Sequence, residues 1–455
     1  ASPVVFAQET LTYDQALQLL RERSDAIHAA DYQVEREYDL RGALDRLHLP
    51  TLNVTAGVLA YGSERTLNIE PLQSAIGQVI PGAETLIPGS IDLDFKGTSP
   101  TAALMSSWLL YTGGRTTAAR RFADANIDQA KAERQLTVEH QDKVLATIYF
   151  GHLLAGRVLR IREDVLAGVE RHLHQATRFE DKGVLSKVER MHAQVAYDEA
   201  RRNLEQARAD FGIADVALRQ LLRHPAPIRP QTPLFVSTQP LSPLMGFLES
   251  GLKDHSQLAL LQAKRKQAEQ GKVIEEARWK PTVAAFGAYN LTPRDADFSD
   301  PLPLLEPDWV VGINLSYPLF DRLNRGRLVS AAERQIQRVD ALERELQTGL
   351  ATVIERSYLS VERARAQFVL LQSNIELTDE TVRLRERLFE EGLGTSLDVV
   401  DARLAAARAE TERVVAAYEY VVSLVGLLEA SSQLEQFSEY VRRADVHLAL
   451  GESSQ

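Results

Sequence analysis

The chain has 455 residues, of which 25% are charged, and its formal net charge is −11 at pH 7. Nucleic-acid-binding proteins concentrate lysine and arginine, so this charge disfavours nucleic acid as a partner. The chain has no cysteine, which excludes disulfides and thiolate metal sites within it, and we expect no lipidated N-terminal cysteine. It has no run of 18 apolar residues, so we expect no transmembrane helix. The first residues, Ala1-Ser2-Pro3, are interpreted as a mature terminus left after export.

The prolines predict where the long helices lie. All 18 of them fall within residues 1–100 or 225–318. Proline removes a helix hydrogen bond and clashes with the preceding turn. The two stretches without proline, 101–224 and 319–455, are therefore expected to form very long helices.

The first half of the chain has one helix, two strands and a helical hairpin. A helical pattern runs from Thr12 to about residue 48, and strand-like runs at 51–61 and 102–111 flank a Gly-, Pro-, Ser- and Thr-rich stretch expected to be a loop. Gly113-Gly114 begins a helix to about residue 180, which ends before Gly183. Ser186 can cap a return helix to about residue 222. Six prolines mark residues 224–243 as a linker.

The second half repeats this order. Residues from Pro50 reappear from Pro281, 231 positions later, and residues 182–186 reappear at 391–395, 209 positions later. The expected elements are a helix at 244–279, strands at 282–291 and 308–319 around a loop at 292–307, a helix at 326–390 and a helix at 396–430. Residues 431–455 form a tail with no assigned structure.

Both helical hairpins carry a heptad pattern. Apolar residues spaced by seven mark the second hairpin: Ile354, Val361, Phe368, Ile375, Val382 and Phe389, then Val400, Ala407, Val414, Val421 and Leu428. This spacing keeps an apolar seam facing a partner helix, so each pair is expected to form an antiparallel coiled coil roughly 100 Å long. An ordinary helical bundle would explain the seam but not the length. The helix expected at 12–48 and the return helix to about residue 222 are each about half as long as the long helix of the hairpin. Placed end to end, they would match its length.

The strands alternate as tilted membrane strands do. One parity is apolar in each: Leu52, Val54, Ala56, Val58 and Ala60; Val283, Ala285, Gly287, Tyr289 and Leu291; Trp309, Val311, Ile313, Leu315, Tyr317 and Leu319. Aromatic residues near the strand ends are typical of a membrane interface. Two hairpins packed on a soluble core would give the same pattern. Four strands cannot close a barrel, and lipid tolerates no open sheet edge, so two, three or four chains would have to contribute strands.

At this point the sequence resembles the TolC-like outer membrane factors of Gram-negative bacteria, over almost all of residues 9–430. The resemblance rests on the repeated order helix–strand–strand–helix–helix, on the junctions 108–115 and 317–327, and on residues 389–402, Phe-Glu-Glu-Gly-Leu-Gly-Thr-Ser-Leu-Asp-Val-Val-Asp-Ala.

The resemblance implies an α+β membrane protein of the outer membrane that extends into the periplasm. The expected assembly is a homotrimer whose 12-stranded β-barrel, with four strands per chain, is continued by a long α-helical coiled-coil barrel with a mixed equatorial domain. Such proteins are passive exit ducts of tripartite efflux pumps or type I secretion systems, gated at the periplasmic helical tip. Their partners are a periplasmic adaptor, an inner-membrane transporter and outer membrane lipid. The alternative is a soluble periplasmic coiled-coil adaptor or structural protein.

The expected domain organisation follows the repeat. It comprises an N-terminal segment and helix (1–49), the first strand pair with an extracellular loop (50–111), the first long helical hairpin (112–223), an equatorial linker (224–243), a helix (244–280), the second strand pair with an extracellular loop (281–320), the second long hairpin (321–430) and a C-terminal equatorial tail (431–455).

The best candidate site is the pair Asp398 and Asp401, which lie three residues apart on one face of a helix start. The resemblance implies that they line the pore constriction, where rings of carboxylates bind cations. Both could instead complement the helix dipole. Their counterparts in the first copy are Glu189 and His192, so the pairing is asymmetric.

The resemblance also implies a gate and a docking surface for the adaptor. The gate region comprises Phe389, Gly392, Gly394 and Arg403, and the adaptor-contact turns comprise Gly183, Ser186, Thr395 and Ser396. The family often has a basic residue at the position of Gly394, and either Arg190 or Arg403 could replace the bond that it makes. Phe389 lacks the hydroxyl that a tyrosine would bring to the gate.

No enzyme site is recognised, so no catalytic residue, metal or cofactor is expected. His172 and His174 are two residues apart on a helix and face different directions, which disfavours a metal pair. Gly392-Leu393-Gly394 lacks the third glycine and the preceding strand of a dinucleotide-binding loop.

Overall fold

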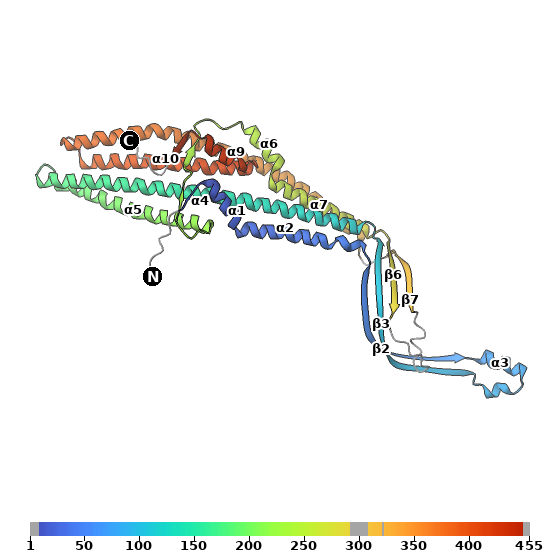
Figure 1. Cartoon of the computed structure of the whole chain (residues 1–455). Coiled ribbons are helices and arrows are strands. Elements are labelled where there is room, and N and C mark those ends of the chain that lie inside the picture. The colour runs from blue at the N-terminus through green and yellow to red at the C-terminus, as the bar shows by residue number, and fades with distance from the viewer. Residues whose placement is uncertain (1–8, 292–307, 321–322, 449–455) are drawn as a thin grey trace, which may run out of the picture. The chain divides into compact units, whose positions relative to one another are not determined.

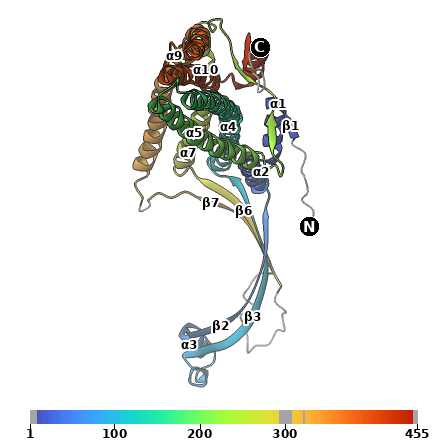
Figure 2. The same ribbon diagram turned by 90° about the vertical axis from the view of Figure 1, so that its left-hand side faces the viewer.

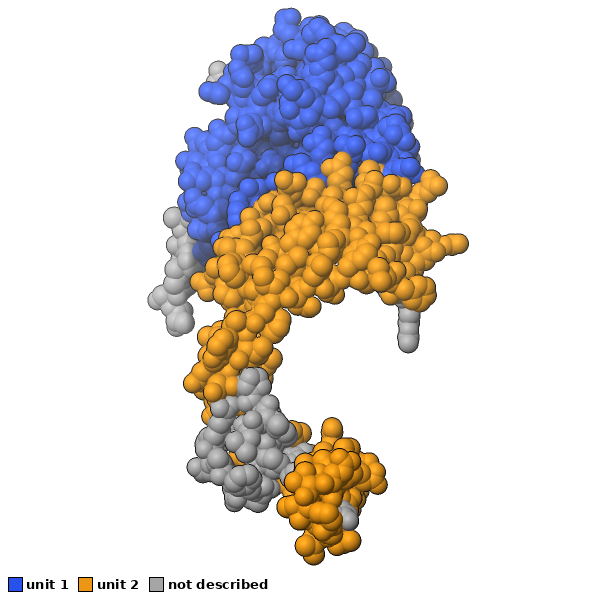
Figure 3. All heavy atoms as spheres, turned by 90° about the vertical axis from the view of Figure 1, so that its right-hand side faces the viewer, with its two compact units in different colours: residues 1–38, 125–266, 337–455 blue, residues 39–124, 267–336 orange. Residues whose placement is uncertain are grey.

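The computed structural model describes residues 9–291, 308–320 and 323–448 (Figure 1). The chain divides into two compact units (Figure 3). Unit 1 contains residues 1–38, 125–266 and 337–455, and unit 2 contains residues 39–124 and 267–336. Unit 1 holds most of the helices, and unit 2 holds the main β-sheet.

The four helices of the two hairpins occur where the proline-free stretches predict them. They are α4 (Arg115–Asp181), α5 (Lys187–Leu221), α9 (Arg325–Glu390) and α10 (Ser396–Ala430). Within unit 1 their segments lie side by side (Figures 1 and 2). The heptad positions Ile354, Val361, Phe368, Val414 and Val421 are all buried in the core of this unit. The apolar seam predicted from the sequence is therefore confirmed.

Shorter helices lie along the long ones. On α4, Arg134 pairs with Asp31 of α2 (Asp25–Ala43), while further along His152 packs on Phe211 of α5 with ring centroids 4.9 Å apart. On α9, Asp340 pairs with Arg265 of α7 (Ser256–Ala277) at 2.8 Å. These contacts agree with the expectation that two short helices share the length of each long one.

Two helices that the sequence predicts as continuous are broken, and each prediction is corrected here. The helix expected over 12–48 forms α1 (Tyr13–Arg23), α2 and the 3-10 helix η1 (Asp45–His48). The helix expected over 244–279 forms α6 (Leu244–Asp254) and α7. Each break is one residue with extended backbone. Ser24 lies between α1 and α2, and His255 lies between α6 and α7. These two residues are 231 positions apart, which is the offset of the repeat.

The main sheet lies in unit 2 and has the strand order β2-β3-β6-β7, all antiparallel. Its strands are β2 (Thr51–Asn68), β3 (Ser90–Tyr111), β6 (Thr282–Asn290) and β7 (Trp309–Ser316). Val54 pairs with Leu104, Leu104 with Tyr289, and Tyr289 with Trp309. Directly paired residues share a face. The three sets of alternating apolar residues predicted from the sequence therefore lie on one face of the sheet.

The expectation of a loop over residues 62–101 is wrong. β2 and β3 pair without interruption from Thr51↔Ser107 to Asn68↔Ser90, and the chain between them forms α3 (Glu70–Val79) and η2 (Ala83–Leu86). Polar contacts support this extension, since Lys96 Nζ lies 3.1 Å from Glu64 and Thr66 Oγ1 lies 2.7 Å from Asp92. The loop expected at 292–307 lies outside the described residues.

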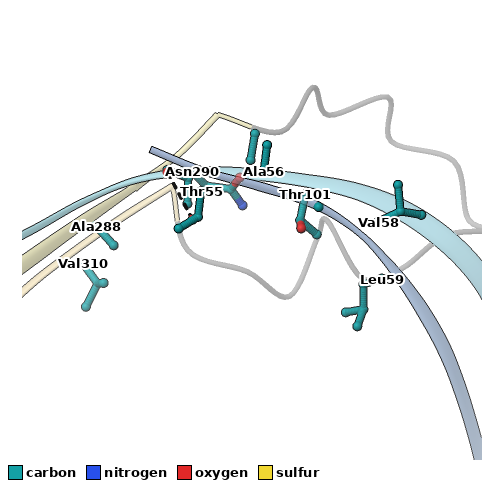
Figure 4. Close-up of a pocket in the computed structure, with 11 residues that line it drawn as sticks. Thr55, Ala56, Val58, Leu59, Thr101, Ala288, Asn290 and Val310 are labelled. Atoms are coloured by element: carbon teal, nitrogen blue, oxygen red, sulfur yellow. Dashed lines mark hydrogen bonds between the residues drawn. The ribbon is translucent and has the colours of Figure 1, made fainter. Parts of the chain in front are cut away.

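A hollow lies in the sheet beside the described ends of β6 and β7. The hollow has a volume of about 650 Å³ and is lined by Thr55, Val58, Thr101, Ala288 and Asn290 among others (Figure 4). Within the described residues, the ladder between β6 and β3 ends at Ala103↔Asn290, followed by a bond from Leu291 N to Ala102 O. Beyond this point β2 and β3 continue as a two-stranded ribbon.

The linker and the tail form a mixed structure in unit 1. β1 (Glu9–Leu11) pairs in parallel with β4 (Ile228–Pro230), and β5 (Leu234–Val236) pairs antiparallel with β8 (Val446–Leu448). The tail, which had no assigned structure, also contains η3 (Leu434–Gln436) and α11 (Phe437–Arg443). An aromatic core holds these elements on α1 and α4, and it consists of Tyr13, Tyr149, Phe150, Phe235 and Phe437.

Helix α4 bears on the expectation that the chain has no transmembrane helix. It is the one helix in the described ranges that is long and apolar enough, by length and composition, to cross a membrane. The same helix supplies Leu145, Tyr149 and Phe150, whose side chains are fully buried in the core of unit 1. A buried core helix meets the same criteria, and one such helix, with 39% of its apolar window buried, is weak evidence of a membrane span.

Candidate functional site

The two turns that join the long helices have closely related backbones. Gly183 and Gly392 both have positive φ, 72° and 75°, and each follows a helix end closed by a backbone bond from the next residue. Val184 N donates to Phe179 O at 2.9 Å, and Leu393 N donates to Leu388 O at 2.9 Å. This Schellman arrangement explains why glycine stands at both positions. The turns predicted at these glycines are confirmed.

Gly394 has a packing role in the second turn. A Cβ at this position would lie 3.2 Å from the backbone nitrogen of Phe389, because the chain returns close to the end of α9. Gly394 N also donates to Leu388 O at 3.1 Å. This close approach favours a glycine over the basic residue that the resemblance led us to look for.

The helices after the two turns are capped differently. Ser186 accepts a bond from Glu189 N at 3.3 Å, and Thr395 accepts one from Asp398 N at 3.2 Å. The Asp398 carboxylate returns to Thr395 and completes a capping box. Glu189, its counterpart in the first copy, instead accepts a bond from Ser396 N at 2.8 Å. Glu189 thus links the start of α5 directly to the start of α10.

A small buried cluster joins the two hairpins beside these turns. Phe389 stacks on Phe179 with ring centroids 5.7 Å apart and meets the His172 ring edge-on at 4.6 Å. His172 Nε2 lies 2.6 Å from Ser396 Oγ, and both residues are buried. We call Phe179, His172, Phe389, Ser396 and Glu189 the tip cluster.

Burial has an electrostatic consequence for His172. Desolvation, together with the nearby Arg403 guanidinium, lowers the pKa of His172 to about 4. The imidazole is therefore neutral at neutral pH and able to share a hydrogen bond with the Ser396 hydroxyl. No local sequence pattern indicates this role, since His172 and Ser396 are 224 positions apart.

Equivalent positions in the two hairpins hold different kinds of contact. In the first hairpin Arg190 Nε lies 2.6 Å from Glu180 Oε2 across the turn. The residues 209 positions later are Phe389 and Val399, which are both buried in an apolar contact. An ion pair in one hairpin thus corresponds to an apolar pair in the other.

Arg403 is held in the second hairpin by an ion pair with Glu386 of α9. Its guanidinium lies against Gly168 of α4, where a Cβ would overlap it. Burial lowers the pKa of Arg403 although Glu386 opposes this effect. Both arginines considered as gate residues are therefore paired within the chain, Arg190 with Glu180 and Arg403 with Glu386.

The two candidate pore residues have different surroundings. Asp398 is half-buried, and hydrogen bonds from Thr395 together with Arg385 at 3.3 Å lower the pKa of its carboxyl group. Asp401 is exposed, and within residues 9–291, 308–320 and 323–448 no ion pair of Asp401 is found. The helix-capping interpretation thus describes Asp398 well, while Asp401 has a free carboxylate.

The family is shown by comparison with known proteins. A model of the outer membrane efflux protein family matches residues 16–223 and 248–432, which is most of the chain. Protein CyaE of Bordetella pertussis is 24% identical over 341 residues, covering 73% of this chain and 70% of that protein.

Solved structures show the same fold. The outer membrane channel CmeC of Campylobacter jejuni has a TM-score of 0.72 at 12% identity, covering 94% of this chain and 88% of that one. The outer membrane protein VceC of Vibrio cholerae has a TM-score of 0.71 at 14% identity, covering 92% of this chain and 95% of that one.

A repeated unit of paired strands and long helical hairpins, with apolar side chains on one face of the sheet, defines a channel protein of the outer membrane. The chain belongs to the outer membrane efflux protein family. It is an exit duct of the outer membrane that extends into the periplasm, so the alternative of a soluble periplasmic protein is not supported. The family and the fold are those of channels rather than of enzymes.

Proposed function

We propose that three copies of this chain form one closed channel. The observation that supports this is the four-stranded sheet, whose outer strands β2 and β7 each pair on one side only in the described part of the chain. Lipid cannot satisfy the backbone groups of an open edge. Joining β2 of one copy to β7 of the next closes the sheet, and three copies give the 12 strands that the family resemblance implies.

In this assembly the two helical turns form the periplasmic tip. They are the breaks farthest along the chain from the strands in both hairpins. Asp398 and Asp401 then form carboxylate rings at the constriction. Phe389, Gly392, Gly394 and Arg403 belong to the gate, whose closed state is stabilised by the tip cluster and by the pair Arg403–Glu386.

The same tip is proposed to contact a periplasmic adaptor, which in turn connects the channel to an inner-membrane transporter. Gly183, Ser186 and Thr395 are exposed and available for such contact. Ser396 is fully buried, so its side chain is removed from the proposed adaptor contacts. Leu393 and Val184, which are 75% and 67% exposed, are better placed.

The test of the channel is subunit number and conductance. After bound detergent is subtracted, the extracted protein should have a mass of about 152 kDa, three times that of the 50.7 kDa chain. Each such trimer should conduct ions as one channel in a planar bilayer. A monomer that remains soluble without detergent would contradict the proposal. For the adaptor, photo-crosslinkers at Val184 and Leu393 should capture it, whereas probes at residues 237–240 should capture it less. The reverse order would place the contact at the equator.

A further inference from the structure

The ribbon beyond the four-stranded sheet carries a small folded cap. β2 and β3 pair through thirteen further positions, from Ala56↔Ala102 to Asn68↔Ser90. At about 3.3 Å per residue the ribbon is roughly 43 Å long. Residues 69–89 at its end, which we call the cap, contain α3 and η2 (Figure 1).

The cap is held in a defined conformation. Asn68 Oδ1 accepts a bond from Glu70 N at 2.9 Å at the start of α3. Gln73 Nε2 donates to Ile87 O at 2.9 Å and ties α3 to the returning chain, while Ile69 N donates to Gly89 O at 3.0 Å and closes its base. The side chains on the cap surface are therefore presented by a folded element.

That surface is apolar to an unusual degree. Leu72, Val79, Ile80 and Leu86 are 56%, 79%, 60% and 84% exposed. Exposed apolar side chains gathered on one small element mark an interaction site. Leu72 and Val79 are seven residues apart on α3, so they lie on the same side of that helix.

The charge of the cap indicates what kind of partner fits. Its 21 residues include Glu70 and Glu84 but no lysine, arginine or histidine, and no aromatic residue. Surfaces that bind anionic lipid headgroups use clusters of Lys and Arg, commonly with aromatic anchors. The cap lacks these features, so its chemistry fits another apolar protein surface.

We propose that the three caps of one channel bind to one another through this apolar face, above the outer mouth of the barrel. This inference rests on the trimer of the proposed function. A barrel of 12 strands tilted by about 40° has a radius of roughly 12 Å, so a ribbon of roughly 43 Å is long enough to bring its cap to the channel axis. Attachment to one barrel also gives the caps an effective concentration in the millimolar range.

Single cysteines test the contact, because the chain has none of its own. Val79→Cys and Leu86→Cys place a thiol on the apolar face, and Ser74→Cys places one on the opposite side of α3. With a short bis-maleimide, the first two variants should give at least tenfold more covalent dimer on a denaturing gel than Ser74→Cys. The yield should not change when the trimers are diluted.

A second substitution tests the apolar character of the contact. In the Leu86→Cys chain, Val79→Glu should reduce the dimer at least fivefold by placing three like charges together, whereas Ser74→Glu should leave it unchanged. Equal crosslinking at all positions, or a yield that falls on dilution, would overturn the inference while the trimer stands. Absence of the trimer itself on a native gel would instead refute the proposed function.

Discussion

We expect the His172 imidazole to make the proposed tip sensitive to acid. Its pKa of about 4 in the folded protein lies below the ordinary value of about 6.5. A state in which the His172 ring is exposed to water therefore binds the proton more readily. The stability that neutral His172 contributes to the proposed closed tip should be complete above about pH 6.5 and be lost as the pH falls toward 4. Glu189, which faces Ser396, and Arg403 also act on this site.

We therefore expect the open probability of single channels to rise between pH 6.5 and pH 4. His172→Gln keeps a side chain that can hydrogen-bond Ser396 but cannot titrate in this range, so its open probability should depend less on pH. An identical pH profile in the two proteins would assign the effect to another group.

Gly168 provides a second prediction at this scale, because it leaves room for the Arg403 guanidinium. Gly168→Ala should displace that flexible side chain and break its pair with Glu386, without moving the backbone. The channel should then open as readily as Arg403→Ala, and the double variant should be no more open than either single one, since both remove the same interaction. Gly212→Ala is the control, since a Cβ there meets nothing within 4 Å.

At the scale of elements, the register of the sheet leads to a test of which face meets lipid. Ile313 is 72% exposed and shares its face with Ala285 and Trp108, whereas Asn314 points to the opposite face. Arginine near the bilayer midplane costs about 2–4 kcal/mol. Ile313→Arg should therefore reduce the yield of membrane-inserted trimer, measured by heat-modifiable mobility on gels, and Asn314→Arg should not. Greater damage from Asn314→Arg would reverse the assignment of the faces.

The sequence allowed prediction of those elements that have a local signal. Proline-free stretches, heptads and strand alternation depend on neighbouring residues, and each predicted its element. The ribbon was missed because residues 62–101 were interpreted from their Gly, Pro, Ser and Thr content, although Ile91, Leu93 and Phe95 alternate with polar residues as they would in a strand. The helix breaks have no proline or glycine, yet Ser24 and His255 occupy equivalent repeat positions, so comparing the two copies residue by residue could have suggested them.

The contacts of the tip cluster could not be predicted from local sequence patterns. The contacts of His172 and Glu189 with Ser396 join residues more than 200 positions apart, and no local pattern marks them. The asymmetry that the sequence analysis found in the repeat was between Asp398–Asp401 and Glu189–His192. Asp398 and Asp401 were recognised, but the capping box that sets them apart depends on side-chain direction.

At the scale of the whole channel, the different surroundings of Asp398 and Asp401 lead to a separate prediction for each residue at the constriction. Three exposed Asp401 carboxylates around one axis should bind multivalent cations entering from the periplasm, and such cations should block the conductance. Asp401→Asn, which keeps the shape and removes the charge, should raise the blocking concentration at least tenfold.

Asp398→Ala should weaken the block less, because Arg385 already neutralises part of its charge. It should also destabilise the start of α10 by about 1 kcal/mol through loss of the capping box, which thermal unfolding can measure. A block that persists unchanged in Asp401→Asn would place the constriction elsewhere.

The pairing of β3 with β6 also dictates an order of events during biogenesis. β2 with β3, and β6 with β7, are neighbours along the chain, but Ala103 meets Asn290 only after the whole first helical hairpin has been closed into a loop. Closing so long a loop is entropically costly and slow. The two strand pairs must therefore wait, with edges open, until the chain has crossed the inner membrane at least as far as Ser316. The sheet of the protomer is therefore completed later than either of its two strand pairs.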